Sequence, residues 1–397
     1  MRNIPTLNIG SAEVLALGCA GILIGVWLKK KLPILDRLCI PTSIVGGLVF
    51  ALITLVLHDR VANFEFDTSL RDLFMIAFMT TVGLNARLSL LKRGGTPVLI
   101  LLGVATGGAI LQNLLGIGIA KSFRLSPLIG IVAGSVALAG GPATSLAFGP
   151  TFEKMGVVGA TETGIAAATF GIAVSGLVAA YIGKTLIRRH KLRPATAEET
   201  SGPQHEIAQR RGSADLLQAI IVIGIAMGLG SLISRGFEHV HFILPSYIGA
   251  LIAAVIVRNV MDASRRISLR QPAIDDCMLV SLYLFIVIAV LSLRLWVLAA
   301  LAVPLIVILV LEVVLCWLMC VTLCFYAMGR DYRAAIVSSG FSGFMLGITA
   351  NAVASMQELV EKFGPSPEAF FIVPVVGAFL IDLTNSIVIT LMANLFR

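Results

Sequence analysis

The sequence predicts an all-α integral membrane protein, and three observations support that fold class. The chain is 57% hydrophobic and only 13% charged, whereas soluble domains are about 25% charged. Apolar runs close to the roughly 20 residues that span a bilayer recur along nearly the whole chain. Two halves of weakly similar sequence flank a polar segment at 184–213. This composition leaves no room for a large water-soluble domain.

Each half is predicted to contribute five transmembrane helices. We expect the first five at 12–28, 40–57, 72–89, 96–120 and 157–183, and the second five at 215–234, 242–257, 275–293, 302–326 and 368–393. Basic residues concentrate on the inner side of a membrane, and most of the 30 Lys and Arg residues do so if the amino terminus is outside. The formal net charge of +8 therefore reflects membrane topology and does not indicate a nucleic-acid partner.

One apolar segment is left over in each half, at about 127–150 and about 334–362. The first contains IVAGSVALAGGPATSLAFGP, whose glycine pair and mid-run proline disfavour one continuous helix. We expect each segment to enter the membrane and return to the same side as a re-entrant hairpin, because irregular backbone is tolerated there only inside protein or beside a watery cavity. The alternative is an ordinary helix-packing surface rich in Gly and Ala.

Five spans per half reverse the orientation of the second half, so the two halves are expected to form inverted repeats. The repeats are predicted at 1–183 and 214–397, with 184–213 as a cytoplasmic linker and both termini outside. Three pairs of landmarks have nearly equal separations in the sequence: Pro41 and Pro245, Gly134 and Gly340, and Gly156 and Gly364. Inverted repeats whose broken segments meet near the midplane are typical of secondary transporters.

Charged and amide side chains inside the predicted spans are candidate cation ligands. A charged side chain costs about 2.5–3.5 kcal/mol at the centre of an inserted helix, and Asp382 lies within the last span. Asn385 follows on the same helix face. The pair suits a sodium ion or a proton relay, or else fixes helix packing. Glu162, Asn85 and Asn113 are weighed in the same way, as cation ligands or as packing hydrogen bonds.

Small and polar residues of the two leftover segments are the candidate substrate ligands. They are Ser135, Gly140, Gly141, Thr144 and Ser145 in the first segment, and Ser342, Thr349 and Asn351 in the second. Helix amino termini at such breaks point N–H groups and positive dipole ends inward. This arrangement suits an anionic substrate without an arginine.

Signals for an enzyme or a resident cofactor are missing from the sequence. It contains no HExxH, GxSxG or Walker A motif, and its five histidines fall in loops or at span edges. Cys316, Cys320 and Cys324 share one helix face and are interpreted as buried thiols, because no His or carboxylate is identified near them to complete a metal or haem site.

The motifs resemble those of the bacterial sodium/glutamate symporter family. The matching stretches are FDTSLRDLFMIAFMTTVGLNARLSLL, QNLLGIGIA, GSVALAGG, ATETGIAAATFG and MQELVEKFGPSPEAFFIVPVVGAFLIDLTNSIVI, in one order over nearly the whole chain. The resemblance implies sodium-coupled uptake of L-glutamate by a homodimer in the bacterial inner membrane, with a fixed scaffold and a moving domain around the two hairpins. The residues that match the family pattern as cation ligands are Asp382, Asn385, Glu162, Asn85 and Asn113.

The chain departs from the family pattern in both hairpins. The first reads GGPATS here and GGHGTG in the family, which keeps Thr144 and loses a histidine. The second reads GFSGFMLGITANA here and GHCGFGLGATPTA in the family. Pro142 and Met345 are therefore expected to make the pocket bulkier and less polar.

Three functions remain open from the sequence. The first is a secondary transporter that couples sodium to uptake of glutamate or a related small carboxylate or amino acid by an alternating-access, elevator-like movement, with no cofactor besides the coupling ion. The second is a proton-coupled carrier of a different organic anion, with Asp382 or Glu162 as the proton carrier. The third is a receptor or channel on the same scaffold, which would bind a ligand without counterflow exchange.

Overall fold

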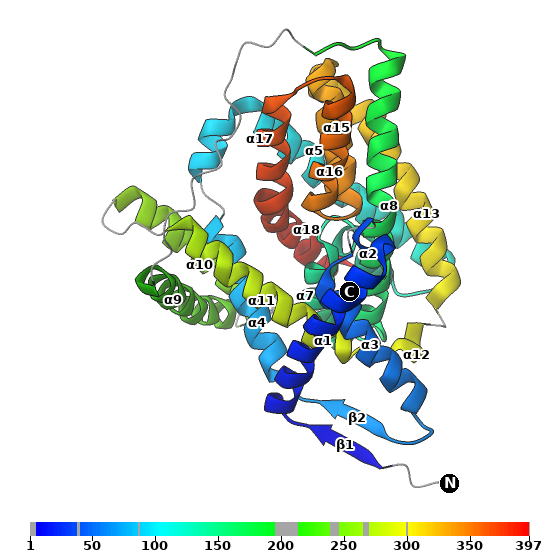
Figure 1. Cartoon of the computed structure of the whole chain (residues 1–397), viewed down its shortest axis with the longest axis vertical. Coiled ribbons are helices and arrows are strands. Elements are labelled where there is room, and N and C mark those ends of the chain that lie inside the picture. The colour runs from blue at the N-terminus through cyan, green and yellow to red at the C-terminus, as the bar shows by residue number, and fades with distance from the viewer. Residues whose placement is uncertain are drawn as a thin grey trace.

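The computed structural model describes residues 5–37, 40–85, 88–194, 213–238, 246–264, 270–298 and 301–396, and these are almost entirely helical (Figure 1). The helices are α1 (Ser11–Lys31), α2 (Pro33–Arg37), α3 (Thr42–Leu57), α4 (Ser69–Asn85), α5 (Leu88–Ser122), α6 (Pro127–Ile131), α7 (Gly141–Lys154), α8 (Ala160–Arg189), α9 (Ser213–Glu238), α10 (Ser246–Ser264), α11 (Gln271–Leu291), α12 (Leu295–Leu298), α13 (Ala302–Met319), α14 (Phe325–Ala327), α15 (Tyr332–Leu346), α16 (Thr349–Phe363), α17 (Pro367–Val375) and α18 (Ile381–Leu395). The π-helical segments are η1 (Val132–Val136), η3 (Cys320–Cys324) and η4 (Val376–Leu380).

The predicted spans correspond to helices throughout the chain. Within the described residues, 8 helices are long and apolar enough to cross a membrane by length and composition. The segments predicted at 40–57 and 72–89 form α3 and α4, which are shorter, at 16 and 17 residues. Helix α8 continues to Arg189, beyond the predicted start of the polar linker, and residues 195–212 of that linker lie outside the described residues.

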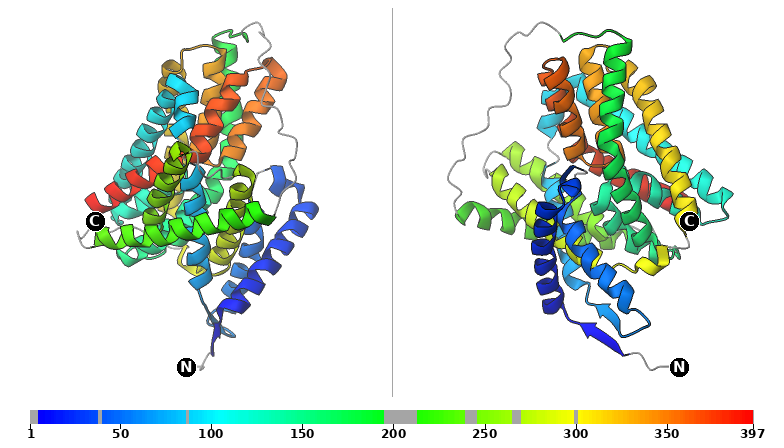
Figure 2. Two further views of the ribbon diagram at one scale, coloured as in Figure 1. Left: turned by 90° about the vertical axis from the view of Figure 1, so that its left-hand side faces the viewer. Right: turned by 45° about the vertical axis from the view of Figure 1, so that its right-hand side comes forward.

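A short parallel sheet is an addition to the predicted all-helical fold. Strand β1 (Thr6–Ile9) pairs with β2 (Asn63–Phe66) in the register Thr6 to Asn63. The pair lies at one end of the molecule, away from α15, α16 and α17 (Figures 1 and 2). Four-residue strands carry almost no periodic signal, and their pairing depends on how α1 and α3 pack together. The sequence alone therefore did not predict them.

Each leftover segment is a helix interrupted near its middle. In the first broken segment (Pro127–Lys154), the backbone leaves helical geometry at Gly134, with φ −86° and ψ −122°, and α7 begins at Gly141 with φ +68°. In the second (Tyr332–Phe363), α15 ends at Leu346 and α16 begins at Thr349. The lack of a side chain at Gly343 lets α16 approach α15 closely, because a Cβ there would lie 2.4 Å from the Cα of Ala352.

Most helix contacts fall within two groups, and one buried core that includes Phe148 of α7 and Tyr247 of α10 joins the groups. In the first group, α1 packs on α3, α9 packs on α10, and α4 packs on both α10 and α11. In the second group, α8 packs against α7, α15 and α16, and α5 packs against α6, α13 and α18. The second group contains both broken segments, so it is the part of the fold that positions the candidate site.

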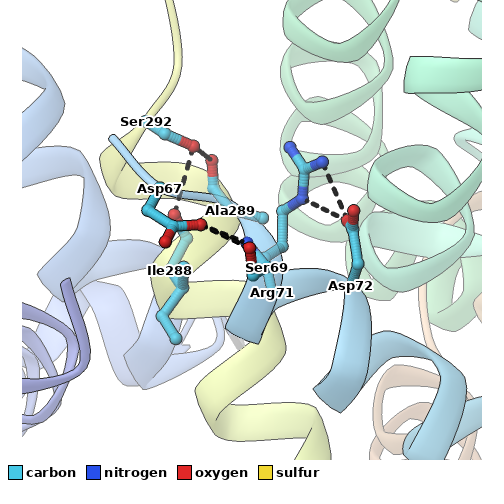
Figure 3. Close-up of polar contacts among 7 residues, drawn as sticks. All are labelled: Asp67, Ser69, Arg71, Asp72, Ile288, Ala289 and Ser292. Atoms are coloured by element: carbon cyan, nitrogen blue, oxygen red, sulfur yellow. Dashed lines mark hydrogen bonds and ion pairs between the residues drawn. The ribbon is translucent and has the colours of Figure 1, made fainter. Parts of the chain in front are cut away.

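The start of α4 is fixed by a carboxylate that follows β2. Asp67 accepts hydrogen bonds from the Ser69 hydroxyl at 2.6 Å and from the Ser69 backbone N–H at 2.8 Å (Figure 3). Figure 3 also shows the Ser292 hydroxyl bonded to the carbonyl oxygens of Ile288 and Ala289 at the end of α11. The Ser69 hydroxyl, and then its N–H, lower the pKa of Asp67 below the ordinary value of 3.8.

Because the pKa of Asp67 is lowered on folding, its contribution to stability is present above pH 3.8 and is lost as the pH falls through the folded value. We predict that Ser69→Ala reduces this acid-dependent loss of stability. Thermal unfolding of the purified protein at pH values above and below 3.8 measures this loss of stability. Ser264→Ala, whose hydroxyl bonds within its own helix, is the control. Equal acid sensitivity in wild type and Ser69→Ala would contradict the assignment.

Candidate functional site

The break in the first broken segment is held by two asparagines from other helices. The backbone leaves helical geometry at Gly134, and the N–H of the next residue, Ser135, donates to Oδ1 of Asn113 on α5, at 3.0 Å. The Ser135 carbonyl oxygen accepts from Nδ2 of Asn385 on α18, at 3.0 Å, and from the N–H of Gly140, at 2.9 Å. Both asparagine side chains are buried. We call this arrangement the Ser135 clamp.

The second break is bonded to the same helix. Nε2 of Gln112, the residue before Asn113 on α5, donates to the carbonyl oxygen of Met345 at 3.0 Å. Two adjacent amides of α5 therefore hold the two breaks, one each. Sequence reasoning missed Gln112, although a second amide in an apolar span was a readable signal.

Other predicted substrate ligands attach the broken segments to α8. The Ser145 hydroxyl donates to the Gly141 carbonyl oxygen at 2.9 Å or to that of Gly164 at 3.2 Å. Nδ2 of Asn351 bonds to the Ile172 carbonyl oxygen at 2.7 Å and to the Ser175 hydroxyl at 2.5 Å. These bonds are packing contacts in this structure.

The remaining predicted substrate ligands lie close to the two breaks. Thr144 and Ser342 are buried, Thr349 is half-buried at the start of α16, and Gly140 and Gly141 form the turn that leads into α7. Pro142 and Met345 are buried in the same region. The positions are consistent with a shared site, although no contact joins all of them.

Several oxygen atoms around the breaks are buried without a hydrogen-bond partner among the described residues. They are Oε1 of Gln112, Oγ of Ser135, Oδ1 of Asn351 and Oδ1 of Asn385. Asp382 lies about one turn before Asn385 on the same face of α18 and is half-buried, with no hydrogen bond or ion pair to the residues that the structure describes. Hard monovalent cations take such oxygen ligands.

Asn85 belongs to a different polar cluster from the clamp. It lies at the end of α4, where it accepts a hydrogen bond from Gln271 of α11, and Nδ2 of Asn85 lies 3.5 Å from Oδ1 of Asp275. Gln271 also donates to Asp275 at 2.9 Å. This cluster connects helices of the first group and does not include either broken segment.

Glu162 is paired with an arginine that sequence reasoning missed. Its Oε1 accepts from the backbone N–H of Arg294 at 3.0 Å and from Nε of Arg294 at 3.4 Å. Arg294 also lies 3.5 Å from Glu153 at the end of α7. Glu162 is 3% exposed and Arg294 is 50% exposed. Arg294 therefore joins the loop after α11 to α7, the second half of the first broken segment, and to α8.

A second buried carboxyl, Glu312 on α13, was also missed. It lies one turn before Cys316, so the interpretation that no carboxylate accompanies the cysteine stripe was wrong. Glu312 was detectable as the one charged residue in an apolar 18-residue helix. Among the described residues, no group of three or more His, Cys, Asp or Glu residues could hold a metal ion.

The long apolar helices and the polar groups gathered at two backbone interruptions define a multi-pass membrane protein of the transporter class. The chain belongs to the sodium/glutamate symporter family, because the family description "Sodium/glutamate symporter" matches residues 7–365. The sodium/glutamate symporter of Escherichia coli (strain K12) is 36% identical over 376 residues, which cover 93% of this chain and 94% of that protein.

The chain also aligns with a second relative and with one solved structure. The sodium/glutamate symporter of Haemophilus influenzae is 36% identical over 382 residues, covering 94% of this chain and 95% of that protein. The solved sodium proton antiporter from Methanocaldococcus jannaschii aligns over 97% of this chain and 98% of that chain, at 14% identity and a TM-score of 0.39, which is too low to support an argument. The named relatives are transporters rather than enzymes.

The Ser135 clamp predicts unequal effects of removing its two amides. Asn113→Ala leaves the buried Ser135 N–H without a partner, so we expect a loss of about 1–3 kcal/mol in the free energy of unfolding. Asn385→Ala removes one of two donors to the Ser135 carbonyl, so the loss is about 0.5–1.5 kcal/mol. Chemical unfolding in detergent measures both values.

The control for the clamp is Thr390→Ala on α18, because that hydroxyl bonds to a carbonyl of its own helix. An effect of Asn113→Ala no larger than that of the control would show that the clamp does not stabilise the break.

The Glu162 ion pair makes a separate prediction. Arg294→Ala leaves a buried carboxylate without its cation, and we expect a loss of about 1–2 kcal/mol, less than for a fully buried pair because Arg294 is half exposed. Adding Glu162→Gln should restore most of this loss. Thermal unfolding of the single and double variants measures the coupling, and independent, additive effects would argue against the pair.

Proposed function

We propose that this chain is a sodium-coupled symporter of L-glutamate, or of a related small amino acid or carboxylate, in the bacterial inner membrane. Family membership over most of the chain carries this proposal. The interrupted helices support it further, because broken helices with free polar groups at membrane depth are how secondary transporters bind ions and substrates.

Sodium is proposed to bind next to the Ser135 clamp. The ligands are the Asp382 carboxylate and Oδ1 of Asn385, with Asn113 holding the break in place. The support is chemical: Asn385 Oδ1 is a buried acceptor that no described residue bonds, and Asp382 lies one turn away on the same helix face. Asn85 and Glu162 would join a cation site only after leaving Asp275 and Arg294, so we assign them to packing in this conformation.

The substrate is proposed to bind between the two breaks. Its carboxylates would meet backbone N–H groups and hydroxyls at the starts of α7 and α16, where the helix dipoles favour negative charge. The proposed ligands are Ser135, Gly140, Gly141, Thr144, Ser145, Ser342, Thr349 and Asn351. The apolar side chains of Pro142 and Met345 would restrict the size of the substrate.

Transport is proposed to follow an alternating-access, elevator-like movement. The pattern of contacts supports this idea, because most helix contacts fall within each group, and the group with the broken segments could move against α1, α3, α4 and α9–α11 along the buried core that joins the groups. The halves would be inverted repeats with re-entrant hairpins, and two chains would form a homodimer through the static group. If one net charge moves inward, a potential of 100 mV contributes about 2.3 kcal/mol to accumulation.

Uptake of radiolabelled L-glutamate into proteoliposomes tests the proposal. We expect an inward sodium gradient to drive uptake, and Asp382→Asn to reduce the rate at limiting sodium by about tenfold or more, since 1.4 kcal/mol of lost ligand energy is a factor of ten in affinity. The matched control is Asp72→Asn, which removes an ion pair with Arg71 at the start of α4. Uptake that needs a proton gradient and no sodium would contradict sodium coupling. Binding without counterflow exchange would instead indicate a receptor.

A further inference from the structure

Glu312 is a buried carboxyl group with no hydrogen-bond or ion-pair partner in the part of the chain that the structure describes. It lies in the middle of α13, where every other residue is uncharged. Its side chain is 0% exposed, and neither carboxyl oxygen has a hydrogen-bond partner among the described residues. An ionisable side chain in such a place marks a functional site by default, because an uncompensated charge at that depth is strongly disfavoured.

The packing of α13 against α15 places Glu312 at the level of the second break. Cys316 Sγ lies 3.9 Å from the Ser342 hydroxyl, and Cys324 lies beside Ser338. The earlier cysteine therefore lies beside the later serine, which means that α13 and its continuation run antiparallel to α15. One turn before Cys316, Glu312 is level with the end of α15 at Leu346 and the break that follows it.

The same helix also packs against the first broken segment. Helix α13 contacts η1, which contains Ser135 of the clamp, and it contacts α5, which bonds to both breaks. Glu312 is thus a carboxyl group on the helix that borders both interruptions. This is the region that the proposed function assigns to the substrate.

No protein cation neutralises Glu312 in the described residues. On the elements that pack against α13, the described titratable side chains are Lys121 of α5, Glu162, Tyr181, Lys184, Arg188 and Arg189 of α8, Cys320 and Cys324 of η3, and Tyr332 and Arg333 of α15, with none on η1. The charged ones lie near helix ends, and Tyr181 is exposed. On its own helix, the nearest titratable group is the Cys316 thiol, one turn away.

We propose that Glu312 carries a proton while the carrier is empty and exchanges it for the α-ammonium group of an amino-acid substrate. The O–H bond of the carboxyl group breaks, its electron pair stays on oxygen, and the proton passes to water on the side to which the site is open. The carboxylate then accepts hydrogen bonds from the ammonium group. The identity of the substrate rests on the proposed function, whereas the proton on Glu312 does not.

This exchange determines whether the affinity for the substrate rises or falls with pH. Each bound amino acid releases about one proton, so its affinity rises about tenfold per pH unit while Glu312 is protonated in the empty carrier. Glutarate has the two carboxylates of glutamate without the ammonium group. Its affinity should not rise with pH in this way.

Calorimetric titration of the purified protein in saturating sodium, from pH 5 to 8, tests the exchange. We expect L-glutamate affinity to rise with pH in the wild type and in the control Glu358→Gln, an exposed position on α16. In Glu312→Gln the affinity should be independent of pH. The number of protons that the wild type releases into weak buffer when L-glutamate binds tests the same exchange without a variant. An unchanged pH dependence in Glu312→Gln, or wild-type binding without proton release, would overturn the proposal.

Infrared spectroscopy separates this proposal from the proposed function. A protonated carboxyl group has a C=O stretching band that a carboxylate lacks, and the band can be measured in the empty protein at neutral pH. We expect a band that is lost in Glu312→Gln and kept in Glu358→Gln. If neither the wild type nor the variants bind glutamate but the wild type shows this band, the assignment of glutamate as substrate fails and the assignment of a proton to Glu312 stands. If the band is absent from the wild type, the proposal for Glu312 is wrong.

Discussion

The rest of the structure depends on one constraint: a backbone that leaves helical geometry at membrane depth must still bond its N–H and carbonyl groups. At the first break, Ser135 meets this requirement through Asn113 and Asn385, which come from α5 and α18. At the second break, Gln112 supplies the bond to Met345. Amide side chains in apolar helices are therefore part of the fold, and they fix which helices surround the two breaks.

The same bonds explain why this region has binding capacity. An amide that uses its nitrogen to hold a backbone carbonyl leaves its oxygen unpaired, as Gln112 and Asn385 do. These oxygens lie around the two breaks, and Asp382 and Glu312 lie on helices that contact η1. Neither carboxyl group has a protein cation as partner among the described residues. Glu162, by contrast, is held by Arg294 and connects the two helix groups. Buried acceptors without donors and carboxyls without cations together favour a site for a cation and a substrate ammonium group.

Much of the fold was predictable because helix length and apolar composition are local properties. The ten apolar segments and the two interrupted ones correspond to helices and broken helices in the structure, but the departure from helical geometry at Gly134, before the glycine pair, was not predicted. The β1–β2 pair was not predictable, because strands of four residues depend on how α1 and α3 pack. The sequence identified Asn113 and Asn385 separately as candidate ligands, but whether both bond to Ser135 depends on how distant helices pack together. Arg294 was missed because its partner lies 132 residues away, whereas Glu312 and Gln112 were visible in the sequence and overlooked.

The central claim is that the break held by the Ser135 clamp is where the coupling cation binds. A structure of the protein with thallium ions tests it most directly, because the anomalous signal of thallium locates monovalent cations without further assumptions. The account predicts a peak within bonding distance of Oδ1 of Asn385 and the Asp382 carboxylate. A peak at the Asn85 and Asp275 cluster, with none beside the clamp, would contradict it.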